Sequence, residues 1–375
     1  MAQERRIYLD YNATSVIDKA VVEYMVSMLN SKAAYNSSSI HAEGRKARGM
    51  LEKARQQIAE ALNIDAYKDD WQIIFLSSGT EANNFVAYNF TKLPMLVGAA
   101  EHVSILDADH KNKIIIPVGQ NGVIESEKLM SLLKIQQGPK LVSIMLANNE
   151  TGVIQDIKAL SEIIHREGGI VHCDASQAFA KIEINLNDLG CDLLTISSHK
   201  CGGPLGAAAL IAKKNIKLTS MIKGGKQEQG LRAGTENLLA IGGFGVAASY
   251  CANKIKEFKQ LETLKNKMEQ SILKIAPEAK IFGADVNRLP NTSSIRMPNV
   301  KSEEQLIKFD LAGISISAGS ACSSGRIASS HVLKAMNIPD DIASEVVRVS
   351  FTPYTTEEDV DSFIELWQKI YKTSN

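Results

Sequence analysis

The sequence predicts an α/β protein in which a large, mainly parallel β-sheet is followed by a smaller α+β part. Short apolar runs alternate with helical segments through the first two thirds of the 375-residue chain, which is typical of a parallel sheet with helices on both faces. Polar residues directly follow most of these runs, at the strand ends where such sheets gather their ligands. After about residue 255 the elements become shorter and more mixed.

Seven runs are predicted to form the strands of the large sheet. They are 72–76, 95–100, 113–118, 140–147, 169–173, 193–197 and 207–212. Helices are predicted before them at about 18–30, which Asp18 can cap, and at about 41–62. Further helices are expected between most of the strands, for example at 82–89 and 155–166.

A long helical region from about 237 to 275 is predicted to join the two parts. The second part is expected to contain strands 279–282, 292–297, 313–317 and 346–350 and helices 302–311, 329–337 and 356–372. The first strand of the chain, 7–10, is expected to fold back onto it. We therefore predict a large domain at 15–255 and a small domain formed by 1–14 with 256–375.

The composition argues against several classes of protein. Apolar residues make up 45% and charged residues 22% of the chain, as in ordinary soluble globular proteins. The formal net charge is zero, so nothing global favours nucleic acid or an anionic membrane. The charged N-terminus does not resemble a secretory or transit signal, and the longest uncharged stretch, 237–253, is better explained as a buried helix than as a membrane span.

The five cysteines include no CxxC pair, which favours free thiols in a reducing cytosol over a disulfide framework or a zinc ribbon. A cytoplasmic protein is therefore expected. Pairs such as His172 with Cys173 do not complete a set of metal ligands, so no metal site is expected.

Two strand ends carry residues with a clear chemical meaning. Lys200 ends the segment Ser197-Ser198-His199-Lys200, which follows a buried strand and precedes a turn. Asp174 follows an earlier strand, roughly one βαβ unit away. This pair suits pyridoxal phosphate, because a lysine can hold its aldehyde as a Schiff base and a carboxylate can keep its pyridine nitrogen protonated. For Lys200 alone, an ordinary solvated lysine is the alternative.

The segment Ser77–Glu81 opens a predicted helix with small residues, whose backbone N–H groups can bind a phosphate. An ordinary N-cap by Ser78 or Thr80 would explain the same residues, and no GxxxxGK[ST] motif supports a nucleotide site. A shared site is favoured because many polar residues stand at strand ends. These are Thr80, His102, Asn149, Asp174, Gln177, Ser197, His199 and Lys200.

Cys322 lies in a run of small residues, Ser317–Gly325. Such a loop would expose the thiol, whose thiolate is the nucleophilic form, whereas the other four cysteines are expected to be buried and structural. Arg348 stands in an otherwise apolar strand. It is either a structural cation or a bidentate clamp for a substrate carboxylate.

Taken together, these segments resemble the class V aminotransferase family, and more closely its cysteine desulfurases of the NifS/IscS type. The matching motifs run in the family's order over nearly the whole chain. They are Tyr8–Thr14, 36–48, 77–84, Glu101-His102, 148–152, 172–177, 197–200, 232–235, 319–325 and Val347-Arg348. The resemblance implies the type I fold of pyridoxal-phosphate-dependent transferases.

The resemblance also implies a role for each residue near the cofactor. Lys200 would bind pyridoxal 5′-phosphate covalently, Asp174 would pair with its ring nitrogen, and Gln177 would contact its ring hydroxyl. His102 would stack on the ring and move protons. The phosphate would be held by Gly79, Thr80, Ser197 and His199.

The remaining implied roles concern the substrate and the partners. Asn149 and Arg348 would engage the substrate, with Asn149 also at the cofactor, and Thr235 would reach the phosphate of the neighbouring subunit in a homodimer. Cys322 would take sulfur from the substrate L-cysteine as a persulfide, with release of L-alanine. The sulfur would pass to an acceptor protein, an iron–sulfur scaffold or a sulfur carrier.

Three departures from the family's pattern bear on acceptor choice, activity level and loop geometry. Ser37 replaces a proline, Lys226 and Gln229 replace a glycine and an arginine, and 326–330 lacks the usual Glu-Pro. Two alternatives stay open. One is another class V reaction, such as that of a selenocysteine lyase or an aminotransferase, and the other is a weakly active paralogue that serves as an assembly platform.

Overall fold

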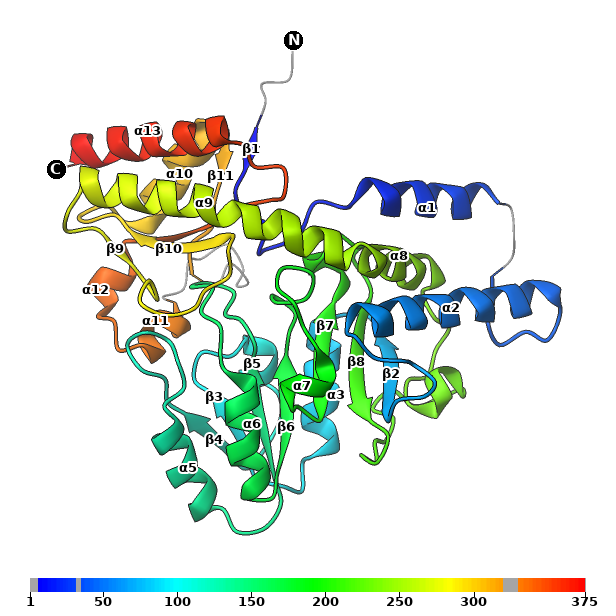
Figure 1. The fold of residues 1–375 in the computed structure, drawn as a ribbon. Helices are drawn as coiled ribbons and strands as arrows, with labels where there is room; N and C mark the ends of the chain where they lie inside the picture. Colours follow the sequence, from blue (N-terminus) through cyan, green and yellow to red (C-terminus); the bar gives the residue numbers. More distant parts are fainter. Residues whose placement is uncertain (1–5, 32–34, 320–329, 375) are drawn as a thin grey trace.

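A seven-stranded sheet with the order β2-β8-β7-β6-β5-β3-β4 lies at the centre of the structure (Figure 1). The computed structural model describes residues 6–31, 35–319 and 330–374. The strands are β2 (Trp71–Leu76), β3 (Met95–Gly98), β4 (Lys113–Ile116), β5 (Lys140–Met145), β6 (Gly169–Asp174), β7 (Leu193–Ser197) and β8 (Ala208–Lys213). Within this sheet β8 is antiparallel to its neighbours β2 and β7, and the other pairs are parallel. The predicted mainly parallel sheet is therefore confirmed.

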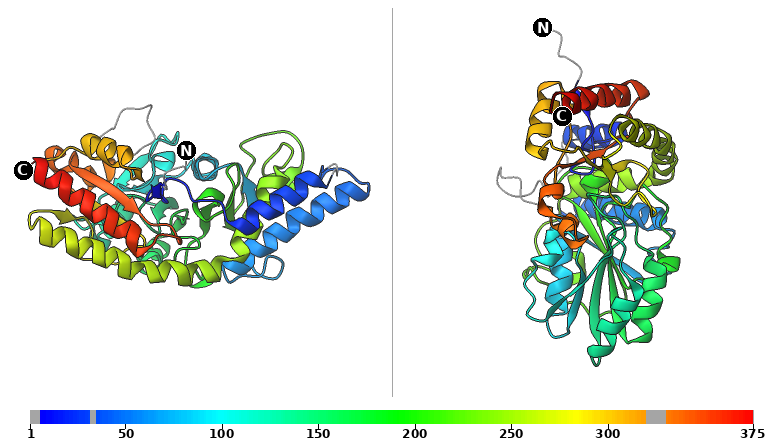
Figure 2. Two further views of the ribbon diagram at one scale, coloured as in Figure 1. Left: turned by 90° about the horizontal axis from the view of Figure 1, so that it is seen from above. Right: turned by 90° about the vertical axis from the view of Figure 1, so that its left-hand side faces the viewer.

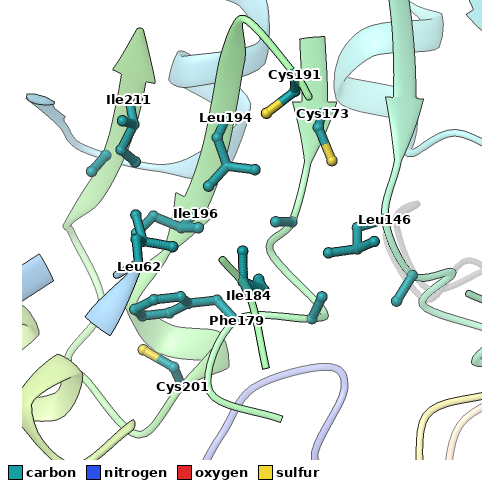
Figure 3. Close-up of a cluster of buried hydrophobic side chains, with 14 of the residues drawn as sticks. Leu62, Leu146, Cys173, Phe179, Ile184, Cys191, Leu194, Ile196, Cys201 and Ile211 are labelled. Carbon is teal, nitrogen blue, oxygen red and sulfur yellow. The ribbon is translucent and has the colours of Figure 1, made fainter. Parts of the chain in front are cut away.

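Apolar layers cover both faces of this sheet, as parallel sheets require. Along β2, Ile73 and Phe75 belong to one buried cluster, whereas Ile74 and Leu76 belong to another. The first cluster includes side chains of α2 (Ala42–Ala61), α6 (Ile157–Arg166) and α8 (Leu238–Ser249). Figure 3 shows part of it around Phe179. The second cluster includes the inner side of α3 (Gly79–Asn89).

The other helices connect the strands or cover the second part of the chain. They are α1 (Lys19–Asn30), α4 (Val103–Leu106), α5 (Ser126–Ile135), α7 (Leu186–Leu189), α9 (Cys251–Ile275), α10 (Ser302–Leu311), α11 (His331–Ala335), α12 (Asp340–Ala343) and α13 (Glu357–Ser374). The helices α1 and α2 extend to one side of the molecule, and α8 packs against both (Figure 2).

The second part of the chain contains two small sheets. β9 (Lys280–Ile281), β10 (Thr292–Arg296) and β12 (Val346–Ser350) form an antiparallel sheet, and β1 (Ile7–Tyr8) pairs with β11 (Ile314–Ser315). A separate apolar cluster joins Leu9 and Tyr11 to residues from Phe258 onward, including α13. The division near residue 255 stays a prediction, which this separate cluster supports.

The long helical region predicted at 237–275 is two helices, because the chain bends by 62° between α8 and α9. No single helix in the described part of the chain is long and apolar enough to cross a membrane, and only this bent pair passes by length and composition together. Most of the apolar side chains of α8 are buried inside the protein.

Three of the seven strands predicted for the large sheet end earlier than expected. The strands predicted at 95–100, 113–118 and 140–147 end at Gly98, Ile116 and Met145. The residues that follow β5, Leu146 and Ala147, are buried although they lie outside the strand. Apolar composition therefore marks the buried path of the chain, and it does not show where the ladder of hydrogen bonds stops.

A buried histidine in the middle of this sheet makes stability depend on pH. His172 on β6 is fully buried, with Nδ1 2.8 Å from Ser143 Oγ and Nε2 3.0 Å from Thr195 Oγ1. Burial lowers the pKa of His172 to about 4, although the charge of Asp174 opposes the shift. The folded protein therefore favours the neutral ring. As pH falls from about 6.5 towards 4, the unfolded chain binds a proton at His172 that the folded protein does not, so the folded protein loses stability over this range.

We expect the free energy of unfolding to fall by on the order of 2–3 kcal/mol from this residue alone over that range. Urea unfolding of the wild type and of a His172→Gln variant, near pH 7 and near pH 4.5, measures it. The variant should lose less stability on acidification than the wild type. Equal losses in both proteins would contradict this assignment.

Candidate active site

A cavity of about 370 Å³ opens at the carboxyl ends of the parallel strands, where the sequence predicted a shared site. Ten of the twelve predicted site residues line it. They are Gly79, Thr80, His102, Asn149, Asp174, Gln177, Ser197, His199, Lys200 and Arg348. Thr235 is exposed and does not line this cavity. Cys322 lies outside the described residues, whereas Gly319 lines the cavity.

Lys200 enters the cavity from a single turn of 3₁₀-helix, Ser198–Lys200, that directly follows β7. Its Nζ donates to the backbone oxygens of Asn12 and Ala13, each at 2.7 Å. The N-terminal loop therefore lies against this lysine, which connects the motif at Tyr8–Thr14 to the strand end.

Asp174 ends β6 and is held by two donors. Its Oδ2 accepts a hydrogen bond of 2.8 Å from Asn83 Nδ2, and its Oδ1 accepts one of 2.9 Å from the backbone of Ser176. Asn83 also donates to Ser104 Oγ at 2.8 Å. One carboxylate is therefore fixed in a buried position, 7% exposed, on the cavity wall.

The beginning of α3 forms a cradle of small residues. Ser78 caps the helix by accepting from the backbone of Glu81 at 3.1 Å, so the N-cap alternative of the sequence analysis is correct for Ser78. A Cβ added to Gly79 would lie 3.5 Å from Ser176 Oγ and 3.6 Å from Ser197 Cβ. Ser197 Oγ is buried without a hydrogen-bond partner among the described residues. An unpaired donor next to a helix N-terminus is suited to an anion.

The two predicted histidines of the cavity favour the neutral form. Burial lowers the pKa of His102, and the positive charge of Lys200 lowers it further, whereas the negative charge of Asp174 opposes the shift. Its Nδ1 accepts from the backbone of Ser104 at 3.1 Å, which leaves the proton on Nε2. Burial and the charge of Lys200 lower the pKa of His199 to about 4.

Arg348 makes structural contacts and also reaches the cavity. Its NH2 group donates to Asp10 at 2.7 Å, and its NH1 group donates to the backbone oxygen of Asn149 at 3.1 Å. Its Nε and Asn149 Oδ1 are buried without a hydrogen-bond partner in the described part of the chain. The structural role proposed from the sequence is therefore present, and two polar atoms remain for a bound molecule.

The sequence analysis missed several residues that build the site. Asn83 lay inside the matching motif 77–84 but was given no role, Lys181 stood in a turn that gave no signal, and His331 begins α11. The ring of His331 lines the cavity and its Nε2 donates to the backbone oxygen of Glu101 at 2.8 Å. Asn12 lay inside a quoted motif, and its position there was the only available signal.

Lys226 and Gln229, which depart from the family's pattern, lie on either side of Glu228, a buried residue that holds this loop in place. Glu228 carboxylate oxygens accept from Arg55 at 3.0 and 3.1 Å and from the backbone of Phe75 at 2.8 Å. Phe75 belongs to the edge strand β2, so Glu228 accepts a hydrogen bond from a backbone N–H at the edge of the sheet. Glu228 and Gln229 have positive φ values of 45° and 59°, and the ion pair holds the loop in that conformation without a glycine at either position.

Comparisons with known proteins agree with this geometry. The family model for aminotransferase class V matches residues 7–363. The cysteine desulfurase IscS of Dictyoglomus turgidum is 36% identical over 380 residues, covering 98% of this chain and 95% of the relative. The cysteine desulfurase NifS of Azotobacter vinelandii is 34% identical, covering 96% and 90%.

The X-ray structure of a NifS-like protein from Rickettsia africae has a TM-score of 0.92 and 40% sequence identity, covering 98% of this chain and 100% of that chain. The fold expected from the resemblance is therefore confirmed. On these matches the chain belongs to the class V aminotransferase family, whose cysteine desulfurases depend on pyridoxal 5′-phosphate.

Proposed function

We propose that this protein is a pyridoxal-phosphate-dependent L-cysteine desulfurase. The observation that carries the proposal is the cavity that brings Lys200, Asp174 and His102 together at the carboxyl ends of the sheet. The motif around Cys322 and the similarity to named cysteine desulfurases over nearly the full chain support the choice of L-cysteine as substrate.

The residues of the cavity fit the cofactor. Its volume of about 370 Å³ is in the range of small-molecule sites. Gly79 and the unpaired hydroxyl of Ser197 would hold the phosphate. Asp174 offers a fixed carboxylate to the ring nitrogen, and Lys200 offers the amine. When bound, pyridoxal phosphate supplies an electron sink for bonds at the α-carbon of an amino acid.

The chain's own groups would do the remaining work. Asn83 and the backbone of Ser176 keep the Asp174 carboxylate in one orientation, so its negative charge has a fixed position in the cavity wall. The neutral ring of His102 holds a proton at Nε2 and can give it to a group that gains negative charge. Asn149 Oδ1 and Arg348 Nε are polar atoms left for the substrate.

Cys322 would be the nucleophile that takes the sulfur. Its thiolate would attack the sulfur atom of L-cysteine, so that an S–S bond forms, the C–S bond breaks, and the carbon gains a proton to give L-alanine. The persulfide would pass to a sulfur-acceptor protein, and we propose iron–sulfur cluster assembly as the pathway. The four other cysteines are buried free thiols, which supports a reducing cytoplasm.

A homodimer is part of the proposal. Thr235 is exposed and does not line the cavity of its own chain, so a second chain is needed if it is to reach a phosphate. The helix α1 exposes Val22, Val26 and Leu29, which are 45%, 49% and 69% exposed. These residues follow one another at intervals of four and three, so they form an apolar stripe suited to a partner.

Release of L-alanine from L-cysteine tests the proposed function. The purified protein, supplied with pyridoxal phosphate and a reductant, should release L-alanine and sulfide in equal amounts. A cofactor-loaded protein that released no L-alanine would contradict the proposal and favour the platform alternative. Amino transfer to a keto acid without release of sulfide would favour an aminotransferase.

A further inference from the structure

A buried lysine that the mechanism does not use lies directly behind the cavity. Lys181 is 1% exposed. Its Nζ donates to Asn12 Oδ1 at 2.7 Å and to Gln177 Oε1 at 2.8 Å. Both acceptors are neutral amides, whereas buried lysines usually face a carboxylate. Burying a lysine without a carboxylate partner costs free energy, so its position between Asn12 and Gln177 suggests a role in the site.

Asn12 connects this lysine to Lys200. The backbone oxygen of Asn12 accepts from Lys200 Nζ at 2.7 Å and from Gln177 Nε2 at 2.9 Å. The side chain of Asn12 is 1% exposed and also donates to Thr292 Oγ1 at 2.9 Å. One short network therefore runs from Lys181 through Asn12 and Gln177 to the amine of Lys200.

The donors of Lys181 help to fix how both amides are turned. A lysine ammonium donates and does not accept. Asn12 and Gln177 must therefore present their oxygens to Lys181, and Gln177 must present its Nε2 to the backbone oxygen that also receives Lys200. The same orientation is supported by other bonds, since Asn12 Nδ2 donates to the backbone oxygen of Asn149 at 3.2 Å and Gln177 Nε2 donates to that of Asn12 at 2.9 Å. Lys181 adds two donors to the oxygen side of this network.

We propose that Lys181 is a positioning residue, which acts through Asn12 and Gln177 to fix where Lys200 and the Gln177 amide meet the cofactor. This inference rests on the proposed attachment of pyridoxal phosphate to Lys200. Lys181 does not itself line the cavity.

The charges around Lys181 give the proposal a measurable consequence. Burial lowers the pKa of Lys181 well below its usual value, and repulsion from Lys200 and Arg348 lowers it further, whereas the nearby Cys201 thiol acts in the opposite direction. The ring of Tyr11 lies 5.6 Å from its Nζ. Because repulsion is mutual, positive charge on Lys181 disfavours a second positive charge on the bond between Lys200 and the cofactor.

A Lys181→Met variant tests this role by spectroscopy. The visible absorbance of the bound cofactor changes with protonation of its bond to Lys200, and the midpoint of that change is measured by pH titration without L-cysteine. Removing a positive charge makes protonation easier, so the midpoint should rise by roughly half a pH unit or more. Loss of stability alone would not move this midpoint.

Two further variants keep the test decisive. Lys140→Met is the matched control, because Lys140 is 2% exposed and its Nζ donates to the backbone oxygens of Leu133 and Glu167, away from the cavity. It should leave the midpoint unchanged even if stability falls. Lys181→Gln also removes the positive charge but keeps a side-chain donor at this position, so it should raise the midpoint as Lys181→Met does.

An unchanged midpoint in both Lys181→Met and Lys181→Gln would overturn the inference, and if Lys181→Met fails to fold then Lys181→Gln decides alone. The titration needs no turnover, so the role of Lys181 is tested even in a protein that does not desulfurate L-cysteine. A wild type without a covalently bound cofactor would instead contradict the attachment at Lys200 that the proposed function assumes.

Discussion

A Cys322→Ala variant should bind pyridoxal phosphate normally yet form no persulfide and release less than about one thousandth of the wild-type amount of L-alanine. Alanine lacks the sulfur atom that must attack the sulfur of L-cysteine, and the residues proposed to bind the cofactor are unchanged. Cofactor binding is measured by visible absorbance, the persulfide by mass spectrometry, and turnover by L-alanine release.

Cys251→Ala is the matched control for this experiment. Cys251 is a free thiol, 5% exposed, and burial raises its pKa to about 11. Its replacement should leave persulfide formation intact and affect stability at most modestly. Normal L-cysteine turnover by Cys322→Ala would refute the role of Cys322, and amino transfer to a keto acid by that variant would favour an aminotransferase.

The main features of the fold could be predicted because β5 and its parallel neighbours are apolar almost throughout. Every residue of β5 is buried, so the run stands out against the amphipathic helices around it. The direction of β8 could not be predicted, since a buried antiparallel strand has the same apolar composition as a parallel one. The bend at Tyr250 could not be predicted either, because α8 and α9 are helical on both sides of it.

The candidate site could be predicted where a residue stands directly at a strand end. Asp174 ends β6 and Lys200 follows β7, so their approach follows from the topology of the sheet. Asn83 and His331 reach the same cavity from a helix interior and from the start of α11. Asn83 lay inside the matching motif 77–84, but nothing there predicted its contact with Asp174, and no pattern marked His331, because these contacts join segments distant in sequence.

Lys181 shows most clearly what a sequence cannot reveal. In the chain it is one of many lysines, in a turn directly after Phe179 and Ala180, and a lysine is ordinarily exposed to solvent. Its near-complete burial depends on the N-terminal loop, which brings Asn12 against β6 and β7 and supplies an acceptor. Such a contact, between residues 169 positions apart, depends on the completed fold.

Replacing Lys200 by alanine should lower L-alanine release by at least about a thousand-fold and abolish the covalent bond to the cofactor. The reason is chemical, because the bond to an aldehyde requires a primary amine at this position. Lys200→Arg keeps the positive charge and reach but cannot replace that amine, so it should be nearly as inactive. Borohydride reduction followed by mass spectrometry should find the cofactor on the peptide of residue 200 in the wild type and in neither variant.

Lys213→Ala is the control that shows whether the loss of activity is specific to Lys200 or follows the removal of any lysine at a strand end. Lys213 ends β8, is about one third exposed, and donates to Asp192 at 2.8 Å outside the cavity. Its replacement should keep turnover within about twofold, since partly exposed ion pairs contribute little. If Lys200→Ala retained both covalent cofactor and turnover, another amine would hold the cofactor. Lys181, which shares Asn12 as an acceptor with Lys200, would then be the amine to test.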